Sequence, residues 1–172
     1  MNRVRKLLAM VASLAALTAC TSAATSDTTA DQAAIRAAGR AWYEAFNSGD
    51  AAAVAAFYAD DAVLAAPNVP AVRGNAAIRD LIAKDIDTFR SSGLTVAQGA
   101  TSDVGVSGDV AWLSDTWAVT DKTGATVDVG KGLTIFQRRG GKWMMIRDTW
   151  NSDGPILIHT TRGSSMFGAP TR

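Results

Sequence analysis

The chain of 172 residues has the length of one globular domain, and 48% of its residues are hydrophobic while 19% are charged. That apolar content excludes a disordered chain, and a single cysteine excludes both an intrachain disulfide and a zinc site built from cysteines. Lys and Arg number 17 against 16 Asp and Glu, so the net charge of +1 provides no field that would attract nucleic acid. Composition favours one packed domain without a nucleic-acid partner.

The first nineteen residues have the pattern of an export signal. Arg3, Arg5 and Lys6 precede an apolar run over residues 7–17, which small residues then follow. This order is that of a secretory signal peptide, and the run is shorter than the ~20 apolar residues that a membrane-spanning helix needs. We therefore predict that residues 1–19 are a signal peptide.

The segment Leu17-Thr18-Ala19-Cys20 resembles a bacterial lipobox. The resemblance implies that Cys20 is lipidated and attaches the protein to a membrane through its N-terminal lipid. Thr21 stands where an Asp would retain a lipoprotein in the inner membrane of enteric-type bacteria, so the periplasmic face of the outer membrane is favoured. The alternative is an ordinary secreted protein in which Cys20 lies near the cleavage site by chance. Residues 20–30, rich in Ser, Thr and Ala, are predicted to be a flexible tether.

Residues 31–153 are predicted to form the domain, and its first half has helical periodicity. Apolar residues predict one helix that ends at Gly49, and Asp50 is the expected N-cap of a second helix that runs to Tyr58. Asn75 is expected to cap a third helix that ends before Gly93. Its buried face consists of five apolar residues: Ile78, Leu81, Ile82, Ile86 and Phe89.

The segment between the second and third helices is predicted to hold a turn and two short strands. Asp60 and Asp61 are expected to form the turn, and residues 62–66 and 71–73 the strands.

After Gly93 the hydrophobic period changes to two. Four strands are predicted, over residues 94–106, 110–120, 125–137 and 142–150. Short Gly-containing turns separate them, and such short connections predict an antiparallel meander. Helices followed by strands indicate an α+β domain. Residues 154–172, richer in Gly, Pro and Ser, are predicted to be a mobile tail.

The last predicted strand is apolar on both faces. Trp143 and Met145 point to one side by alternation, whereas Met144, Ile146 and Trp150 point to the other. Because helices cover only one face, the second face predicts contact with another copy of the chain, and hence a homodimer.

Five sequence segments resemble the NTF2-like superfamily, and within it the SnoaL-like, ketosteroid-isomerase-like and DUF4440 domains. They are WYEAFNSGD at 42–50, FYADDAVLAAP at 57–67, VRGNAAI at 72–78, GKW at 141–143 and RDTWNSD at 147–153. The resemblance implies a cone, in which three N-terminal helices pack on a strongly curved antiparallel meander sheet. It also implies an apolar pocket at the open end of the cone.

The resemblance does not extend to the catalytic residues of the ketosteroid isomerases. The position of their general-base Asp is Ala66 here, that of the oxyanion-hole Tyr is Trp42, and that of the second oxyanion donor is Gly132. Steroid isomerisation needs a base and a donor to the enolate, so it is not expected. The one histidine, His159, lies in the predicted tail, which argues against a His dyad, a Ser-His-Asp triad and a His-built metal site. No metal and no cofactor is expected.

Asp148 is the remaining catalytic candidate. The register that the resemblance implies directs it into the pocket and Arg147 away from it. Six residues are predicted to bind the ligand: Trp42, Tyr58, Ala66, Asp128, Gly132 and Trp150. Two roles remain open for Asp148: burial could raise its pKa and suit it to acid/base chemistry, or a cation such as Lys131 could hold it ionised as a structural group.

The leading functional hypothesis is a periplasmic lipoprotein whose pocket binds a small, mostly apolar molecule. The alternatives are an isomerase, dehydratase or hydrolase that uses Asp148 as its acid/base group, and a scaffold that acts through dimerisation alone.

Overall fold

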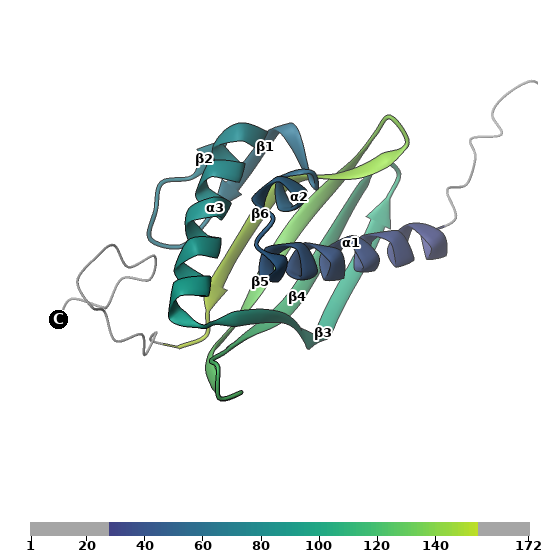
Figure 1. Ribbon diagram of the computed structural model, residues 1–172. Helices are drawn as coiled ribbons and strands as arrows, with labels where there is room; N and C mark the ends of the chain where they lie inside the picture. The colour runs from purple at the N-terminus through teal and green to yellow at the C-terminus, as the bar shows by residue number, and fades with distance from the viewer. Residues whose placement is uncertain (1–27, 155–172) are drawn as a thin grey trace, which may run out of the picture.

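The computed structural model describes residues 28–154, which form three helices packed on one face of a curved sheet (Figure 1). The helices are α1 (Thr28–Ser48), α2 (Ala51–Ala55) and α3 (Asn75–Ser92). The strands are β1 (Tyr58–Ala65), β2 (Val72–Arg73), β3 (Thr95–Ser107), β4 (Val110–Thr120), β5 (Thr126–Arg139) and β6 (Lys142–Ser152). The predicted signal peptide, Cys20 and the tail after Gly154 lie outside the described residues.

The six strands form one sheet in the order β2-β1-β6-β5-β4-β3. The antiparallel meander from β3 to β6 is confirmed. β1, however, pairs with β6 in parallel, with Leu64 opposite Asp148. The sheet is therefore mixed, whereas a wholly antiparallel sheet was expected. A parallel pair needs a long connection, and α3 with the whole meander provides it between β1 and β6.

Three local expectations around β1 are wrong. The second helix ends at Ala55 and not at Tyr58, which begins β1. Asp60 and Asp61 lie within β1 and not in a turn, on exposed positions of that strand. Asn75 does not cap α3; Gly74 occupies the cap position, and the Asn75 amide instead donates to Ala55 O at 2.7 Å and Tyr58 O at 3.0 Å. The side chain thereby fixes the start of α3 to the α2–β1 junction.

Helix α1 begins at Thr28, inside the predicted tether, and its N-terminal turn is tied to the β5–β6 hairpin. Asp31 is buried and forms an ion pair with Arg138 at 2.5 Å, and it accepts a hydrogen bond from Trp143 Nε1 at 3.1 Å. The Arg138 guanidinium lies over the Trp143 ring, 4.3 Å from its centroid. These contacts hold the first turns of α1 against the sheet.

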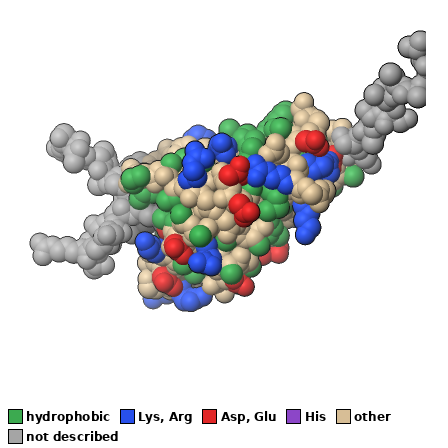
Figure 2. Space-filling view, turned by 90° about the horizontal axis from the view of Figure 1, so that it is seen from above, with side chains coloured by type: hydrophobic (Ala, Val, Ile, Leu, Met, Phe, Trp, Pro, Cys, Tyr) green, Lys and Arg blue, Asp and Glu red, His purple; other side chains and the backbone are tan. Residues whose placement is uncertain are grey.

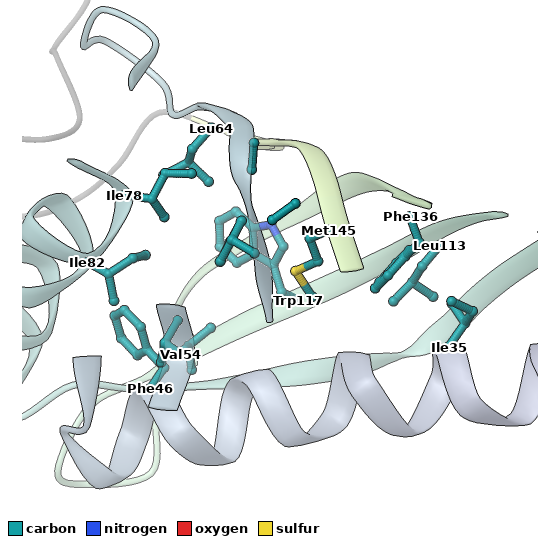
Figure 3. Close-up of a cluster of buried hydrophobic side chains, with 14 of the residues drawn as sticks. Ile35, Phe46, Val54, Leu64, Ile78, Ile82, Leu113, Trp117, Phe136 and Met145 are labelled. Carbon is teal, nitrogen blue, oxygen red and sulfur yellow. The ribbon is translucent and has the colours of Figure 1, made fainter. Parts of the chain in front are cut away.

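The hydrophobic core lies between the helices and the inner face of the sheet. Figure 3 shows Phe46 of α1, Ile82 of α3, Trp117 of β4 and Met145 of β6 pointing into this space, and each is at most 7% exposed. The apolar stripe predicted for the third helix therefore packs where the 3.6-residue period placed it.

A bulge in β6 changes which of its side chains face inward. Phe136 of β5 is opposite Met145, whereas the preceding Ile135 is opposite Arg147, so Ile146 is the extra residue. An extra residue reverses the alternation beyond it. Met145, Asp148 and Trp150 consequently share the inner face, and the expected separation of Met145 from Trp150 is wrong.

The outer sheet face is apolar, although through other strands than expected. Trp112, Leu133 and Val129 are 38–44% exposed on the neighbouring strands β4 and β5. The Trp112 ring lies over Gly105 of β3, where a Cβ atom would be 1.8 Å from the ring. Elsewhere, in the view of Figure 2, acidic and basic side chains are interspersed. None of the helices within residues 28–154 has the length and apolar content needed to cross a membrane.

Candidate ligand-binding site

A cavity of about 100 Å³ lies between α1, α3 and the inner face of the sheet. One water needs ~10–15 Å³ on this scale, so the cavity has room for several waters or a small organic group. Its wall is mostly aromatic and aliphatic, with a few polar groups on the sheet and on α3. The lining side chains are Trp42, Tyr43, Phe46, Ile82, Asp85, Phe89, Val96, Leu113, Asp115, Trp117, Val119, Thr134, Met145, Asp148, Thr149 and Trp150, and Gly39 and Gly132 complete it.

Gly132 keeps the floor of the cavity open. It lies on β5 between Asp115 of β4 and Trp150 of β6, which are its direct partners in the sheet. A Cβ atom there would lie 3.2 Å from Asp115 Oδ1. Asp115 and Asp148 lie on either side of β5, opposite Gly132 and Thr134 respectively. Because neighbouring strands lie ~4.8 Å apart, the backbones of the two Asp residues are roughly 10 Å or more apart.

Asp148 belongs to a chain of hydrogen bonds at one side of this floor. Tyr58 donates its hydroxyl to Asp148 Oδ2 at 2.5 Å and itself accepts from Trp42 Nε1 at 3.1 Å. Thr134 donates to Asp148 Oδ1 at 3.0 Å. Burial raises the pKa of Asp148, the two hydroxyl donors oppose that rise, and the nearby Asp115 adds to it. The carboxyl group therefore takes up a proton more readily than an ordinary Asp.

Lys131 does not neutralise Asp148. Its ammonium group pairs with Asp153 on the outer side of the sheet. The second role considered for Asp148 was a structural carboxylate kept ionised by Lys131, and Lys131 is not available for that role.

Asp115 and Tyr43 form a second carboxyl–phenol pair beside the first. The Tyr43 hydroxyl donates to Asp115 Oδ2 at 3.0 Å, and Gln98 donates to the same oxygen at 2.9 Å. Burial raises the pKa of Asp115, and these two hydrogen bonds oppose the shift. Burial and the neighbouring Asp115 likewise raise the pKa of Tyr43, so its phenol stays protonated.

Asp85 is a third carboxyl group in the wall and has different surroundings. It is 4% exposed, and within the described part of the chain its side chain makes no hydrogen bond or ion pair. Burial raises the pKa of Asp85 to about 7, while Lys84 slightly opposes the rise. Near neutral pH, Asp85 is thus divided between its neutral and charged forms.

The described lining contains no Lys, Arg or His, so no cation balances the three carboxyl groups. Nor do residues 28–154 contain a group of His, Cys, Asp and Glu side chains arranged to hold a metal ion. What the arrangement offers chemically is hydrogen bonding and proton exchange at carboxyl groups surrounded by aromatic rings.

The structure brings together four of the seven site residues predicted from sequence. Asp148, Trp42, Gly132 and Trp150 line the cavity. Tyr58 lies behind Asp148, 1% exposed, and reaches the site through its hydroxyl. Ala66 and Asp128 are not among the lining residues: Ala66 is buried after β1, and Asp128 accepts a hydrogen bond from Ser152 at 2.6 Å.

Asp85, Asp115 and Tyr43 were not predicted from the sequence as site residues, although the positions of Asp85 and Asp115 in the hydrophobic pattern indicated burial. Asp85 follows Ile82 by three residues and precedes Phe89 by four, so it lies on the buried face of α3. Asp115 lies midway between Leu113 and Trp117 on the alternating buried face of β4. A charged residue in a buried periodic position is the pattern that indicates a polar cavity wall.

The SnoaL-like domain family matches residues 39–146, which include most of the cavity wall. The chain therefore belongs to the SnoaL-like family and has the NTF2-like α+β fold with helices packed on a curved mixed sheet. None of the curated protein sequences matches it.

Solved structures agree with this fold. An NTF2-like protein from Novosphingobium aromaticivorans with a cystatin-like fold is 23% identical, with a TM-score of 0.65 over 77% of this chain and 86% of that one. An NTF2-like protein of unknown function from Pseudomonas putida is 20% identical, with a TM-score of 0.67 over 84% of this chain and 99% of that one. A protein of unknown function from Nostoc punctiforme, with a cystatin-like fold, is 17% identical, with a TM-score of 0.68 over 76% and 97%.

Proposed function

We propose that this domain binds a small, mostly apolar molecule in the cavity between α1, α3 and the sheet. The observation that carries the proposal is an aromatic wall surrounding a floor on which two carboxyl–phenol pairs, Asp148–Tyr58 and Asp115–Tyr43, flank the space above Gly132. A cavity that is mostly apolar, with a few convergent polar groups, is the usual form of a small-molecule site.

A cavity-filling variant tests this proposal. Gly132→Leu should abolish retention of a small molecule by the purified protein, measured by mass spectrometry of the organic extract. Lys131→Leu is the matched control, because this exposed neighbour on β5 is not part of the cavity wall. Equal retention by Gly132→Leu and the parent chain would contradict the proposal.

A second candidate function is acid/base catalysis by Asp148, as in an isomerase, a dehydratase or a hydrolase. The raised pKa of Asp148 and the engagement of Lys131 with Asp153 favour it, because a carboxyl group that takes up a proton more readily than an ordinary Asp is suited to act as a general acid. Asp148→Asn should abolish turnover of small carbonyl substrates while the thermal midpoint changes little. Turnover that survives in Asp148→Asn would exclude the role.

We also propose that the protein is a lipoprotein attached through Cys20 to the periplasmic face of the outer membrane. The lipobox-like Leu17-Thr18-Ala19-Cys20 supports this location. Cys20→Ala should abolish incorporation of labelled fatty acid and move the protein to the soluble fraction. If Cys20→Ala stays with the membrane, the lipid anchor is wrong.

A further inference from the structure

The strongest unexplained feature of the cavity is Asp85. A buried carboxyl group normally has a hydrogen-bond donor or a cation beside it, because an unpaired charge away from water is costly. Asp148 and Asp115 each accept two side-chain hydrogen bonds, whereas Asp85 accepts none from the described residues and is 4% exposed. Its carboxyl group lines the cavity, so a molecule in the cavity can reach it.

The side chains around Asp85 are those that favour a cation. Phe89 follows one helical turn later, its ring makes an edge contact with Phe46 at 5.2 Å between centroids, and Phe46 stacks on Trp42 at 5.3 Å. Aromatic faces attract organic cations, and a carboxylate beside them supplies the opposite charge. No basic residue of the described lining competes for that position.

Combining these observations, we infer that the ligand is an organic amine, whose ammonium group binds Asp85 and whose apolar body lies against Trp42, Phe46 and Phe89. This inference rests on the proposed function of small-molecule binding and names its ligand class. The ammonium group supplies Asp85 with the missing donors, and Asp148 and Asp115 remain across the cavity to hydrogen-bond other polar groups of the ligand.

Binding of an amine is coupled to loss of a proton from Asp85. Lys84, an exposed neighbour on the same helix, is the charge that acts on Asp85, and the other titratable groups of the described cavity lining are Tyr43 on α1, Asp115 on β4 and Asp148 on β6. With the pKa of Asp85 at about 7 in the free protein, an arriving ammonium group at pH 6.5 favours the carboxylate and releases its proton to the buffer. Amine affinity therefore rises with pH between about 5 and 8.

The test compares amines with uncharged molecules of the same shape on the purified full-length chain. 2-Phenylethylamine and tryptamine are titrated beside 2-phenylethanol and tryptophol by calorimetry at pH 8 and pH 5. We expect the amines to bind about tenfold or more tightly than the alcohols at pH 8. The preference should shrink at pH 5, and amine binding at pH 6.5 should release protons in buffers of different ionisation enthalpy.

Two substitutions on α3 complete the test. Asp85→Asn should abolish the preference for amines, whereas Asp87→Asn, which removes an equal charge from an exposed position of the same helix, should retain it. Alcohols that bind as tightly as amines at pH 8 would overturn the inference and leave the proposed function standing. If neither amines nor alcohols bind, the proposed function fails and the inference fails with it.

Discussion

Asp85 and Asp148 both line the cavity and both have raised pKa values, yet their surroundings differ. Asp148 is held by the hydroxyls of Tyr58 and Thr134, so either protonation state has hydrogen-bond partners. Asp85 has no such partner among the described residues, and its charged form must be accommodated by an apolar wall. The free protein therefore loses stability when Asp85 ionises.

Asp85→Asn should make the free protein more stable at pH 8 and leave it unchanged at pH 4. The unfolded chain releases this proton near pH 3.8 and the folded chain near pH 7, so between these values the folded state binds more protons and stability falls as pH rises. Since one pKa unit corresponds to about 1.4 kcal/mol, we expect a gain on the order of 2–4 kcal/mol at pH 8.

Urea unfolding of Asp85→Asn and of the parent chain, at both pH values, measures this difference. Asp115 and Asp148 also have raised pKa values, but both remain in the variant, so the comparison isolates Asp85. The exposed Asp87→Asn is again the control. A variant less stable than the parent at pH 8 would show that Asp85 has a cationic partner.

At this scale the sequence predicted Asp148, Trp42, Gly132 and Trp150 on the cavity wall, because the family resemblance supplied the register. Asp128 does not line the cavity, and no pattern in the sequence indicates its hydrogen bond with Ser152. The hydrogen bond between Tyr58 and Asp148 could not be predicted from the sequence either. It depends on the parallel pairing of β1 with β6, and the two residues are 90 positions apart in the chain.

At the scale of the elements, β5 is the strand whose backbone the Trp117 ring approaches closely. Gly130 is buried on its inner face, and a Cβ atom there would lie 2.2 Å from both the Asn151 carbonyl oxygen and the Trp117 ring. Trp117 therefore lies directly on the β5 backbone, and the close contact needs a residue without a side chain.

Gly130→Ala should destabilise the domain by about 1–3 kcal/mol, because both the β6 backbone and the Trp117 ring must move. Gly132→Ala is the matched control on the same strand and face, where the nearest atom would be at 3.2 Å. Thermal unfolding should show a clearly larger loss for Gly130→Ala. Equal losses for the two variants would mean that the contact with Trp117 relaxes without cost.

The elements themselves were largely predictable, since the 3.6-residue and two-residue periods separate α1 and α3 from the four strands of the meander. The parallel pairing of β1 with β6 was not, because hairpin rules apply only to strands that follow each other along the chain. The bulge at Ile146 could not be predicted either. The alternation of inward and outward side chains is inferred from the sequence on the assumption that a strand contains no extra residue.

On the scale of the whole molecule, the outer face of the sheet is a surface that none of the helices within residues 28–154 covers. Trp112, Leu133 and Val129 form an exposed apolar patch on β4 and β5, and a patch of this kind usually indicates an interaction site. We expect a second copy of the chain to cover this patch. The homodimer therefore stays a prediction, but its interface is now expected on β4 and β5 and not on the last strand.

Leu133→Glu should convert the homodimer to a monomer, because it places a charge in the centre of the apolar patch. Light scattering at micromolar concentration measures the mass of each species. Thr88→Glu, on the exposed surface of α3, should remain dimeric. If the parent chain is monomeric at every concentration, the dimer is wrong.

The pairing of β1 with β6 also determines when the domain can fold. During synthesis β1 emerges more than 70 residues before β6, its only long neighbour in the sheet, and until then its inner edge has no partner in the finished order. We therefore expect the sheet to close only after the last strand is made, and a contact between residues so far apart in the sequence is expected to form slowly. The edge of β1 that pairs with β6 is therefore expected to stay open to chaperones and to aggregation until Lys142–Ser152 has been made.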